Sequence, residues 1–399
     1  MPQPSSKSLT IIFVTTLIDM IGFGIVIPIL PFFAEHFGAN GFEIGLLTSV
    51  YLLMQFICTP VWGYFSDRWG RRPVILICIF ASSLAYVVFG LAQSLALILA
   101  ARIIGGVFAG KFATIQAYIA DVTTKENRSK GMGLFGAAFG LGFILGPSIG
   151  GILGKWGYQT PLFFAAALTM INGIAAIFLL PESLSGETRA QAQSNREENK
   201  LNLDAIRRYA SVPVIRSVMT LSMIYNFGFS ILYATFALFA EREFGFHTME
   251  TGYMFAFMGI VGAIIQGGLI GKISRAIGEE KMIVYGLLIT AAGMFAMSQS
   301  KWLWLLMAAS FLISVGSALL TPALSGLVSK KSSETEQGRI LGIIQSVSNL
   351  ARMTGIAFGG FVFEAVNIWS PFWMSGIILT AGCGIAYYRF LTEAEIQEV

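Results

Sequence analysis

Long apolar runs separated by short polar gaps cover the whole chain. A helix needs about 20 apolar residues to cross roughly 30 Å of hydrocarbon, and each run has about that length. The pattern predicts twelve spans, over residues 8–34, 42–64, 73–93, 95–120, 131–153, 160–180, 213–240, 249–271, 281–299, 302–328, 339–363 and 368–391. We therefore expect an all-α integral membrane protein with twelve transmembrane helices.

A polar stretch rich in Ser, Gln, Asn, Glu and Arg divides the spans into two sets of six. It predicts an N-terminal six-helix bundle over residues 1–181 and a C-terminal six-helix bundle over residues 213–399. The residues between them, 182–212, form the expected cytoplasmic linker.

The two halves also carry a faint internal repeat. Shifting one half along the other by about 206 to 209 positions aligns several glycines. Gly63 and Gly70 fall on Gly271 and Gly278, and Gly146, Gly150 and Gly151 fall on Gly355, Gly359 and Gly360. The repeat predicts two pseudo-symmetric bundles, an arrangement in which transporters place the binding site near the bilayer midplane, between the repeats.

Composition and charge agree with a membrane protein and indicate its orientation. Charged residues make up 12% of the chain, against roughly 25% in a soluble globular protein. Three of the 26 Lys and Arg residues fall outside (Lys155, Arg242 and Lys301) and three lie within spans, which leaves about 20 on the linker side. We therefore expect both termini in the cytoplasm of a cell whose inner (plasma) membrane holds the protein. The net charge of +4 reflects this orientation and does not indicate nucleic acid binding.

The first span and the cysteines argue against a cleaved signal peptide, a disulfide framework and a metal site. The first span is too long for the apolar part of a signal peptide and lacks a small-residue cleavage site, so it should stay in the mature protein. Cys58, Cys78 and Cys383 all lie in spans, which argues against a disulfide framework or a metal site. We expect neither a metal nor another cofactor.

Four ionisable residues lie inside spans, where charge is costly and functional roles are common: Asp19, Arg102, Lys111 and Arg352. Asp19 lies about 11 residues, or roughly 16 Å, into the first span, and it is the only deep carboxylate. A buried carboxyl group beside a cation can titrate in the working range, because burial disfavours its charged form and the cation favours it. Asp19 is therefore the expected proton-coupling residue, and it is also a candidate substrate-binding residue.

The deep cations leave two interpretations open. Lys111 follows Arg102 by nine residues, which places the two on opposite sides of an uninterrupted helix. Three deep cations against one acid favour an anionic or zwitterionic group on the substrate. Alternatively, Lys111 pairs with Asp19, and Arg352 with a carbonyl or a helix end. Other polar or amphipathic side chains in spans complete the expected cavity lining: Gln116, Tyr225, Asn226, Tyr233, Gln266 and Asn349.

The gap between the second and third spans reads GYFSDRWGRRP, over residues 63–73. Its pattern G-x-x-x-D-R-x-G-R-R resembles the signature loop of the major facilitator superfamily. The resemblance implies that Asp67 engages the positive end of helix 11 and that Asp121 pairs with the loop arginines. The alternative is that these charges only enforce topology. The candidate gating residues are Gly63, Asp67, Arg68, Gly70, Arg71 and Asp121.

The fifth span carries closely spaced glycines and a proline, which permit close helix packing and a kink. This element resembles the antiporter signature of the drug/H+ antiporter branch, although ordinary small-residue packing gives the same pattern. Its candidate residues are Gly142, Gly146, Pro147, Gly150 and Gly151. LIDMIGFGIVIPILP at residues 17–31 and FLLPES at residues 178–183 are similar to the tetracycline/H+ antiporter group of that branch. The resemblance implies that Arg102 assists proton transfer. An acid that the group carries in helix 9 corresponds to about Thr290; this departure argues against tetracycline itself as the substrate and leaves the resemblance to the group intact.

These observations together predict a proton-coupled secondary active transporter that exports a small amphipathic compound by alternating access. We expect a monomer in the lipid bilayer with protons and a small molecule as its partners. An enzyme is not expected, since the spans contain no histidine, no paired carboxylates and no nucleophile elbow. Two alternatives stay open: an exporter or flippase of an anionic or lipid-like molecule that uses Lys111 and Arg352, and a non-transporting membrane sensor.

Overall fold

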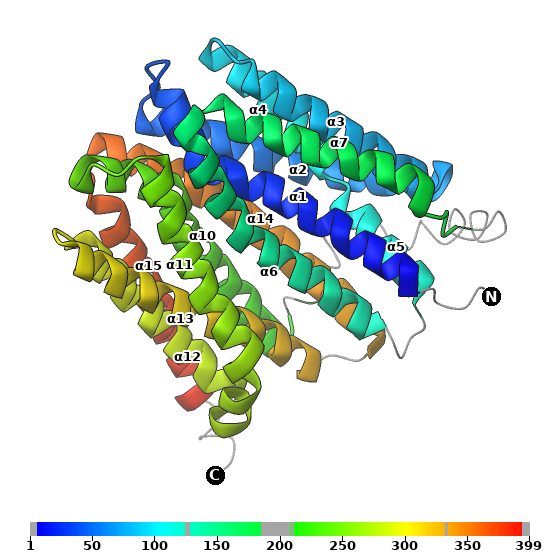
Figure 1. The fold of residues 1–399 in the computed structure, drawn as a ribbon. Helices are drawn as coiled ribbons and strands as arrows, with labels where there is room; N and C mark the ends of the chain where they lie inside the picture. The colour runs from blue at the N-terminus through cyan, green and yellow to red at the C-terminus, as the bar shows by residue number, and fades with distance from the viewer. Residues whose placement is uncertain (1–5, 124–127, 185–208, 210, 332–333, 393–399) are drawn as a thin grey trace. The chain divides into compact units, whose positions relative to one another are not determined.

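The computed structural model describes residues 6–123, 128–184, 209, 211–331 and 334–392. Helices make up nearly all of this part of the chain, and no strand occurs in it (Figure 1). Ten segments in the described residues are long and apolar enough to cross a membrane. One of them, Thr248–Ser298, is interrupted at Gly278 and so covers two of the predicted spans. A further 32-residue helix, Glu334–Ala365, covers the predicted span over residues 339–363, although it is not among these ten apolar segments.

The first half of the chain forms its six spans from seven α-helices. Their order is α1 (Ser6–Glu35), α2 (Gly41–Trp69), α3 (Arg71–Gly90), α4 (Leu95–Ala109), α5 (Phe112–Val122), α6 (Arg128–Leu153), the short 3-10 helix η1 (Gly154–Trp156) and α7 (Gln159–Leu179). α4 and α5 together make the fourth span.

The second half begins at α10 and repeats this order. It contains α10 (Pro213–Phe244), α11 (Thr248–Ile264), the π-helical turn η3 (Ile265–Leu269), α12 (Ile270–Ser298), α13 (Leu303–Lys331), α14 (Glu334–Ala365), α15 (Ser370–Tyr387) and the terminal π-helical turn η4 (Tyr388–Thr392). Since residues 185–208 and 210 lie outside the described residues, so does most of the expected linker.

Contacts between residues divide the chain into two compact units. Unit 1 comprises Met1–Ala39, Val50–Lys200 and Thr248–Tyr253. Unit 2 comprises Asn40–Ser49, Leu201–His247 and Met254–Val399. Each unit thus includes a short helix segment from the other half of the sequence. The bundle boundaries at residues 181 and 213 stay a prediction.

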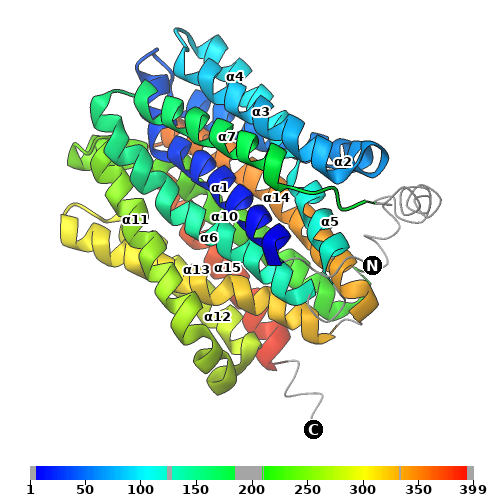
Figure 2. The ribbon, with the colours of Figure 1, turned by 45° about the vertical axis from the view of Figure 1, so that its right-hand side comes forward.

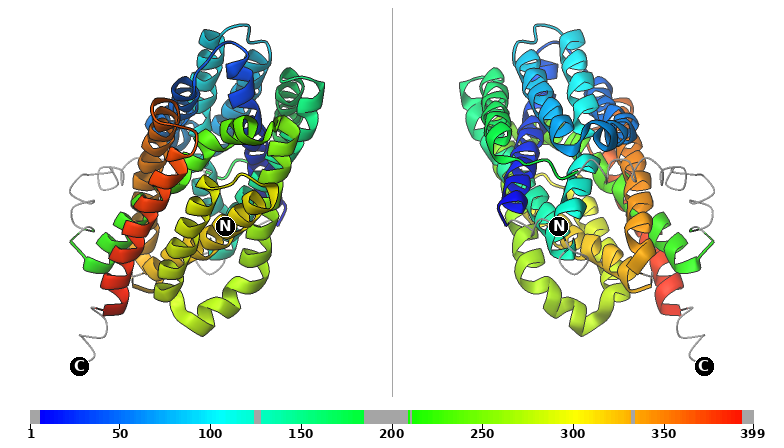
Figure 3. Two further views of the ribbon diagram at one scale, coloured as in Figure 1. Left: turned by 90° about the vertical axis from the view of Figure 1, so that its left-hand side faces the viewer. Right: turned by 90° about the vertical axis from the view of Figure 1, so that its right-hand side faces the viewer.

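The helices inside each unit pack in matching pairs. In unit 1, α1 packs against α6 and α7, and α3 packs against α4 and α7 (Figures 1 and 2). In unit 2, α10 packs against α14 and α15, and α12 packs against α13 and α15 (Figure 3). The two sets correspond helix by helix, so the faint repeat in the sequence reflects a repeated packing scheme.

Glycines at repeat-related positions carry the same unusual backbone. Gly70 has φ 111° and ψ 157°, and Gly278 has φ 77° and ψ 163°. Only glycine adopts this region readily. At each glycine one span ends and the next begins after a sharp change of direction. This explains why both halves have a glycine at this position although the charges around it differ.

Two close helix contacts through glycine also follow the repeat. In unit 1, Gly151 of α6 lies against Gly252 of α11, so closely that a Cβ atom on Gly151 would come 2.8 Å from the Gly252 Cα atom. In unit 2, Gly360 of α14 lies against Gly45 of α2, with the corresponding distance at 3.2 Å. These contacts explain why the first turns of α2 belong to unit 2 and the first turns of α11 belong to unit 1.

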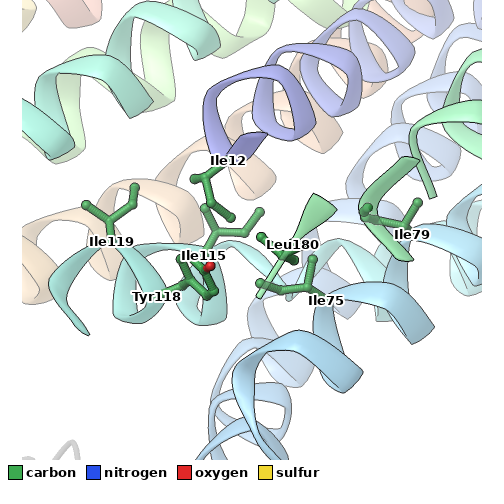
Figure 4. Packing of buried hydrophobic residues seen from close by; sticks show 8 residues of the cluster. Ile12, Ile75, Ile79, Ile115, Tyr118, Ile119 and Leu180 are labelled. Carbon is green, nitrogen blue, oxygen red and sulfur yellow. The ribbon is translucent and has the colours of Figure 1, made fainter. Parts of the chain in front are cut away.

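A hydrophobic core closes unit 1 on the linker side. Ile12 of α1, Ile75 of α3, Ile115 of α5 and Leu180 after α7 meet there in full burial (Figure 4). The hydroxyl group of Tyr118 in the same cluster donates a hydrogen bond to the Pro181 carbonyl at 3.0 Å. This core fixes the end of α7 next to α3 and α5, where the polar loop described below is built.

We predict that Gly278→Ala lowers the stability of the protein by about 1–3 kcal/mol, because alanine is strained at this backbone conformation. The matched control is Gly271→Ala in the same helix, where an added methyl group meets nothing within 4 Å. That change should be neutral or stabilise by about 0.5–1 kcal/mol, since alanine favours helix. Thermal unfolding in detergent compares the two variants. Equal shifts in one direction would contradict the backbone argument.

Candidate transport site

A buried ion pair joins the first span to the fourth. The ammonium nitrogen Nζ of Lys111 lies 2.9 Å from Oδ1 of Asp19, and the two side chains are 2% and 6% exposed. Lys111 also donates to the Ser82 hydroxyl of α3 at 3.3 Å. In the described part of the chain, the second carboxylate oxygen, Oδ2 of Asp19, is buried without a hydrogen-bond partner. The pairing that the sequence left open is therefore present in the structure.

Lys111 lies where the fourth span is interrupted. The sequence predicted an uninterrupted helix over residues 95–120, but α4 ends at Ala109 and α5 begins at Phe112. The indole nitrogen of Trp62 in α2 donates to the Val107 carbonyl at 2.6 Å. In a continuous helix this carbonyl accepts the backbone N–H of Lys111, so the indole replaces a helical hydrogen bond.

The glycines of α6 hold the helix that carries Asp19. A Cβ atom on Gly146 would lie 2.6 Å from the Gly24 Cα atom, and one on Gly150 would lie 2.6 Å from the Ile25 carbonyl oxygen. Gly142 packs as closely against Met20, the neighbour of Asp19. Pro147 also touches Gly24. The glycine pattern thus brings α1 and α6 into backbone contact, and the role of this helix in antiport stays a prediction.

Arg102 lies in the same interior on α4. It is 4% exposed, and its guanidinium carbon lies 4.2 Å above the centre of the Tyr51 ring. A cavity of about 20 Å³ is lined by these two residues together with Ser82 and Tyr86, which is room for about one water molecule. Because Ser82 also contacts Lys111, this cavity borders the ion pair.

The loop between α2 and α3 is organised around the buried guanidinium of Arg71. Its Nη1 atom donates to Oδ1 of Asp67 at 2.5 Å and to the Ser66 hydroxyl at 2.7 Å. Its Nε atom donates to Oδ2 of Asp121 at 3.1 Å. Asp67, Arg71 and Asp121 are therefore brought together. The proposed contact of Asp67 with helix 11 stays a prediction.

The other candidate gating residues have simpler positions. Arg68 is exposed in the last turn of α2, and Gly63 is partly buried one and a half turns earlier. Gly70 forms the sharp turn into α3. The pairing of Arg71 with Asp121 brings α3 and α5 together.

Sequence analysis missed Glu182 as a site residue. Its carboxylate accepts the backbone N–H groups of Arg71 at 2.9 Å and Arg72 at 3.3 Å. It thereby caps the first turn of α3, where Gly70 has no side chain to do so, and a carboxylate is favourable at a helix N-terminus. Its place in the FLLPES segment was the available signal, but that segment was treated as a span end followed by a linker.

Unit 2 carries a different polar cluster. Nη2 of Arg352 on α14 donates to Oδ1 of Asn226 on α10 at 3.0 Å. Asn226 in turn donates to the Ser222 carbonyl at 2.8 Å. The acceptor of Arg352 is therefore a neutral side-chain carbonyl. On the same α14 helix, the Gln345 amide donates to Asn349 at 3.1 Å.

Aromatic rings extend this cluster along α10. Tyr225 stacks on Phe229 with ring centres 5.2 Å apart, and Phe229 meets Tyr233 at 5.4 Å. Gln116 on α5 and Gln266 in the π-helical turn η3 are exposed. Neither has a hydrogen bond to the two polar clusters within the described residues, so the structure does not join them to either cluster.

Comparison with known proteins places these features in a family. The model of the Major Facilitator Superfamily matches residues 12–297 and 267–398. Multidrug resistance protein 2 of Bacillus subtilis (strain 168) is 33% identical over 382 residues, which covers 95% of this chain and 94% of that protein. Tetracycline resistance protein, class C, of Escherichia coli is 29% identical over 384 residues, or 95% of this chain and 96% of that protein. The crystal structure of the human organic anion transporter MFSD10 aligns with a TM-score of 0.71 at 26% identity, covering 97% of this chain and 100% of that one.

We predict that Asp19→Asn and Lys111→Gln each destabilise the protein by about 3–5 kcal/mol, because each leaves a buried group without its partner. The double variant should recover most of this loss. Arg242 and Glu364 provide a matched control, since they form an ion pair at 4.0 Å with side chains 40% and 43% exposed. Arg242→Gln should cost at most about 1 kcal/mol. Unfolding in detergent measures all four variants, and additive losses in the double variant would contradict a paired buried charge.

Proposed function

Because the chain belongs to the major facilitator superfamily, we propose that it is a proton-coupled secondary active transporter that exports a small amphipathic compound by alternating access. Proteins of this family are transporters and not enzymes, and the chain is a multi-pass membrane protein. The observation that carries the proposal is the buried ion pair of Asp19 and Lys111. A carboxylate inside a membrane span is a functional candidate because it can bind a proton and lose its charge.

The names of similar proteins support drug-like substrates. They include multidrug resistance proteins 1 and 2 of Bacillus subtilis, tetracycline resistance proteins of several classes and quinolone resistance protein NorA of Staphylococcus aureus. These compounds share an amphipathic character rather than a common scaffold. Export of such a compound, with antibiotic resistance as a consequence, is the function we assign to this chain.

Coupling rests on the chemistry of Asp19. When its carboxylate is ionised, Lys111 balances it. A proton on Asp19 removes that balance and weakens the tie between α1 and the fourth span. We propose that this change biases the exchange between inward-open and outward-open states, while Arg102, which lines the same small cavity as Ser82, assists the movement of the proton.

Each unit offers candidate substrate contacts in this proposal. Apolar walls with a few polar anchors suit an amphipathic ligand. On unit 2, Tyr225, Asn226, Tyr233 and Arg352 offer rings, an amide and a guanidinium. Further contacts in the proposal come from Asp19, Lys111, Gln116, Gln266 and Asn349.

The loop cluster of Asp67, Arg71 and Asp121 is the proposed gate on the linker side. We place that side in the cytoplasm of the plasma membrane, together with both termini, because positive charge concentrates there. The functional unit is a monomer. An exporter of anionic or lipid-like molecules and a membrane sensor are no better supported by the similar proteins than drug export.

We predict that Asp19→Asn abolishes proton-driven export in proteoliposomes, since asparagine cannot take up or release the coupled proton. Ethidium serves as the probe, and an imposed proton gradient drives its movement. The loss should be at least about tenfold, as expected when an essential proton-transfer group is removed. Glu243→Gln, in the last turn of α10, is the control and should transport normally. Uphill export by Asp19→Asn with the pH dependence of the parent would show that Asp19 is not the coupling residue.

A further inference from the structure

Three buried polar atoms on α1 and α7 lack a hydrogen-bond partner within the described residues: Oδ2 of Asp19, Oγ1 of Thr169 and Nδ2 of Asn172. The residues that carry these atoms are 7%, 1% and 5% exposed. Most buried polar groups in folded proteins are paired, because leaving one unpaired costs stability. Atoms that stay unpaired in one state of a protein are therefore candidates for pairing with one another in a second state.

α1 and α7 pack side by side and run in opposite directions (Figure 2). Ile12, near the start of α1, shares a buried core with Leu180, which follows α7. Ile25, farther along α1, shares another with Ala165, near the start of α7. One register therefore holds along the whole contact between the two helices.

This register places Thr169 level with Asp19. The Thr15 hydroxyl on α1 donates to Oδ1 of Asn172 on α7 at 3.3 Å, which fixes one point of the register. From that point Asp19 lies four residues along α1, a rise of roughly 6 Å. Thr169 lies three residues back along α7, a rise of roughly 4.5 Å in the same direction.

Thr169 also faces α1. Four residues of α7 recur at a spacing that puts them on one face of a helix: Ala165, Thr169, Asn172 and Ala176. Ala165 shares a core with Ile25 of α1. Asn172 accepts the hydrogen bond from Thr15 of α1. Because Thr169 lies between these two contacts on the same face, its side chain is directed at α1.

The unpaired atoms suit a protonated carboxyl group better than an ionised one. An ionised carboxylate only accepts hydrogen bonds, and Oδ1 of Asp19 accepts from Lys111 at 2.9 Å. A protonated carboxyl group also has an O–H that needs an acceptor, and an ammonium group has none to offer. The Thr169 hydroxyl can accept this bond, while the Asn172 amide nitrogen can donate to a carboxyl oxygen.

We propose that Thr169 and Asn172 are positioning residues that hold the carboxyl group of Asp19 while it carries the coupled proton. The proposal rests on the coupling role assigned to Asp19 above. A hydronium ion gives its proton to Oδ2 of Asp19 and leaves as water. The new O–H group donates to the Thr169 hydroxyl, and the Asn172 amide donates to the same carboxyl group. The reverse steps release the proton.

Protonation then changes the helix to which α1 is tied. The ionised Asp19 ties α1 to the fourth span through Lys111. The protonated Asp19 ties α1 to α7 instead. Lys111 loses its counter-charge and keeps the Ser82 hydroxyl as a partner at 3.3 Å. The proton therefore loosens one helix contact of unit 1 and tightens another, and a ligand that favours one arrangement in this way shifts the population toward it.

The other titratable groups around this site do not compete for the same proton. Those near the ion pair on α2, α3 and α4 are Tyr51, Cys78, Tyr86 and Arg102. Tyrosine, cysteine and arginine side chains ordinarily titrate above neutral pH. α7 and residues 134–153 of α6 contain no titratable side chain. On α5, Tyr118 and Asp121 bond to Pro181 and Arg71 on the linker side.

Infrared difference spectra of the purified full-length protein in lipid test the proposal, because the C=O stretch of a protonated carboxyl group shifts with the hydrogen bonds that the group makes. Thr169→Val removes the hydroxyl and keeps the shape of the side chain. It should move the Asp19 band to higher frequency. It should also require roughly three- to tenfold more acid to bring the band to half its height, the range for one hydrogen bond. Asn172→Leu should act in the same direction, and Thr169→Ser should match the parent.

Thr235→Val is the matched control. Thr235 on α10 is also fully buried, but its hydroxyl donates to the Ile231 carbonyl of its own helix at 2.8 Å. This variant should leave the position and the acid dependence of the band unchanged. Thr169→Val should in addition slow proton-driven ethidium export in proteoliposomes about three- to tenfold. Its unfolding temperature should be no lower than that of the parent, since it replaces an unpaired buried hydroxyl with a methyl group.

Three results would overturn the positioning role. They are a band with the parent's position and acid dependence in both Thr169→Val and Asn172→Leu, a Thr169→Ser variant that behaves like Thr169→Val, and a parent without an Asp19 band at any pH. If Thr169→Val does not fold, an unshifted band in Asn172→Leu is enough to reject it.

The coupling role of Asp19 and the positioning role fail in different ways. Loss of export in Asp19→Asn together with unshifted bands in Thr169→Val and Asn172→Leu would reject the positioning role and leave the coupling role standing. Undiminished proton-driven export by Asp19→Asn together with a shifted band in Thr169→Val would keep the positioning role and reject the coupling role.

Discussion

The ion pair of Asp19 and Lys111 is the interaction on which the interior of unit 1 depends. A carboxylate and an ammonium in an apolar interior are tolerated only in close contact, so three elements have to arrive at one point. α6 positions α1 through backbone contacts at its glycines. Trp62 of α2 donates to the Val107 carbonyl where the fourth span is interrupted just before Lys111. α3 supplies Ser82 as the third partner.

The two units share a scaffold but differ in chemistry. The loop after α2 and its repeat in α12 show this at the level of single side chains. In unit 1, Arg71 donates to the Ser66 hydroxyl at 2.7 Å. At the repeat-related positions in unit 2, the Ser274 hydroxyl donates to Glu279 at 3.1 Å. The backbone and the serine are kept while the charge reverses, so only the first loop offers a buried cation that gathers carboxylates from separate spans.

The same asymmetry holds in the interior. Asp19 corresponds in the repeat to Tyr225. In unit 2, the arginine within a span, Arg352, donates to the neutral Asn226. Protonation can therefore alter the charge balance around one unit's cation and not around the other's. In the proposed mechanism this difference gives the two similar bundles different roles, because the proton acts on the unit that carries Asp19.

Much of the fold follows from hydropathy, and much of the site does not. The spans could be predicted because lipid leaves the backbone no hydrogen-bond partner outside its own helix, so every long apolar run becomes helical. The break at Lys111 could not, because an indole from another span accompanies it. Gly110 lies at the break, but Gly105 and Gly106 lie within the unbroken α4, so the glycines alone do not locate it. The expectation that Arg102 and Lys111 point in opposite directions relied on an uninterrupted helix.

Side-chain partners were predictable only where few choices existed. The pairing of Asp19 with Lys111 was one of the two alternatives that the sequence left open, and the structure shows it. Arg71 and Asp121 could be paired through the family resemblance. Glu182 was missed because its role depends on the end of α7 lying beside the start of α3, which is a property of the packed core around Ile75 and Leu180.

The central claim is that Asp19 is the group that takes up the proton. Infrared difference spectroscopy of the purified protein in lipid tests it directly, because a protonated carboxyl group absorbs apart from a carboxylate and from an amide. On acidification, the parent should gain a protonated-carboxyl band that Asp19→Asn lacks, and Lys111→Gln should show the band at higher pH, since the balancing cation is gone. An unchanged band in Asp19→Asn would contradict the account.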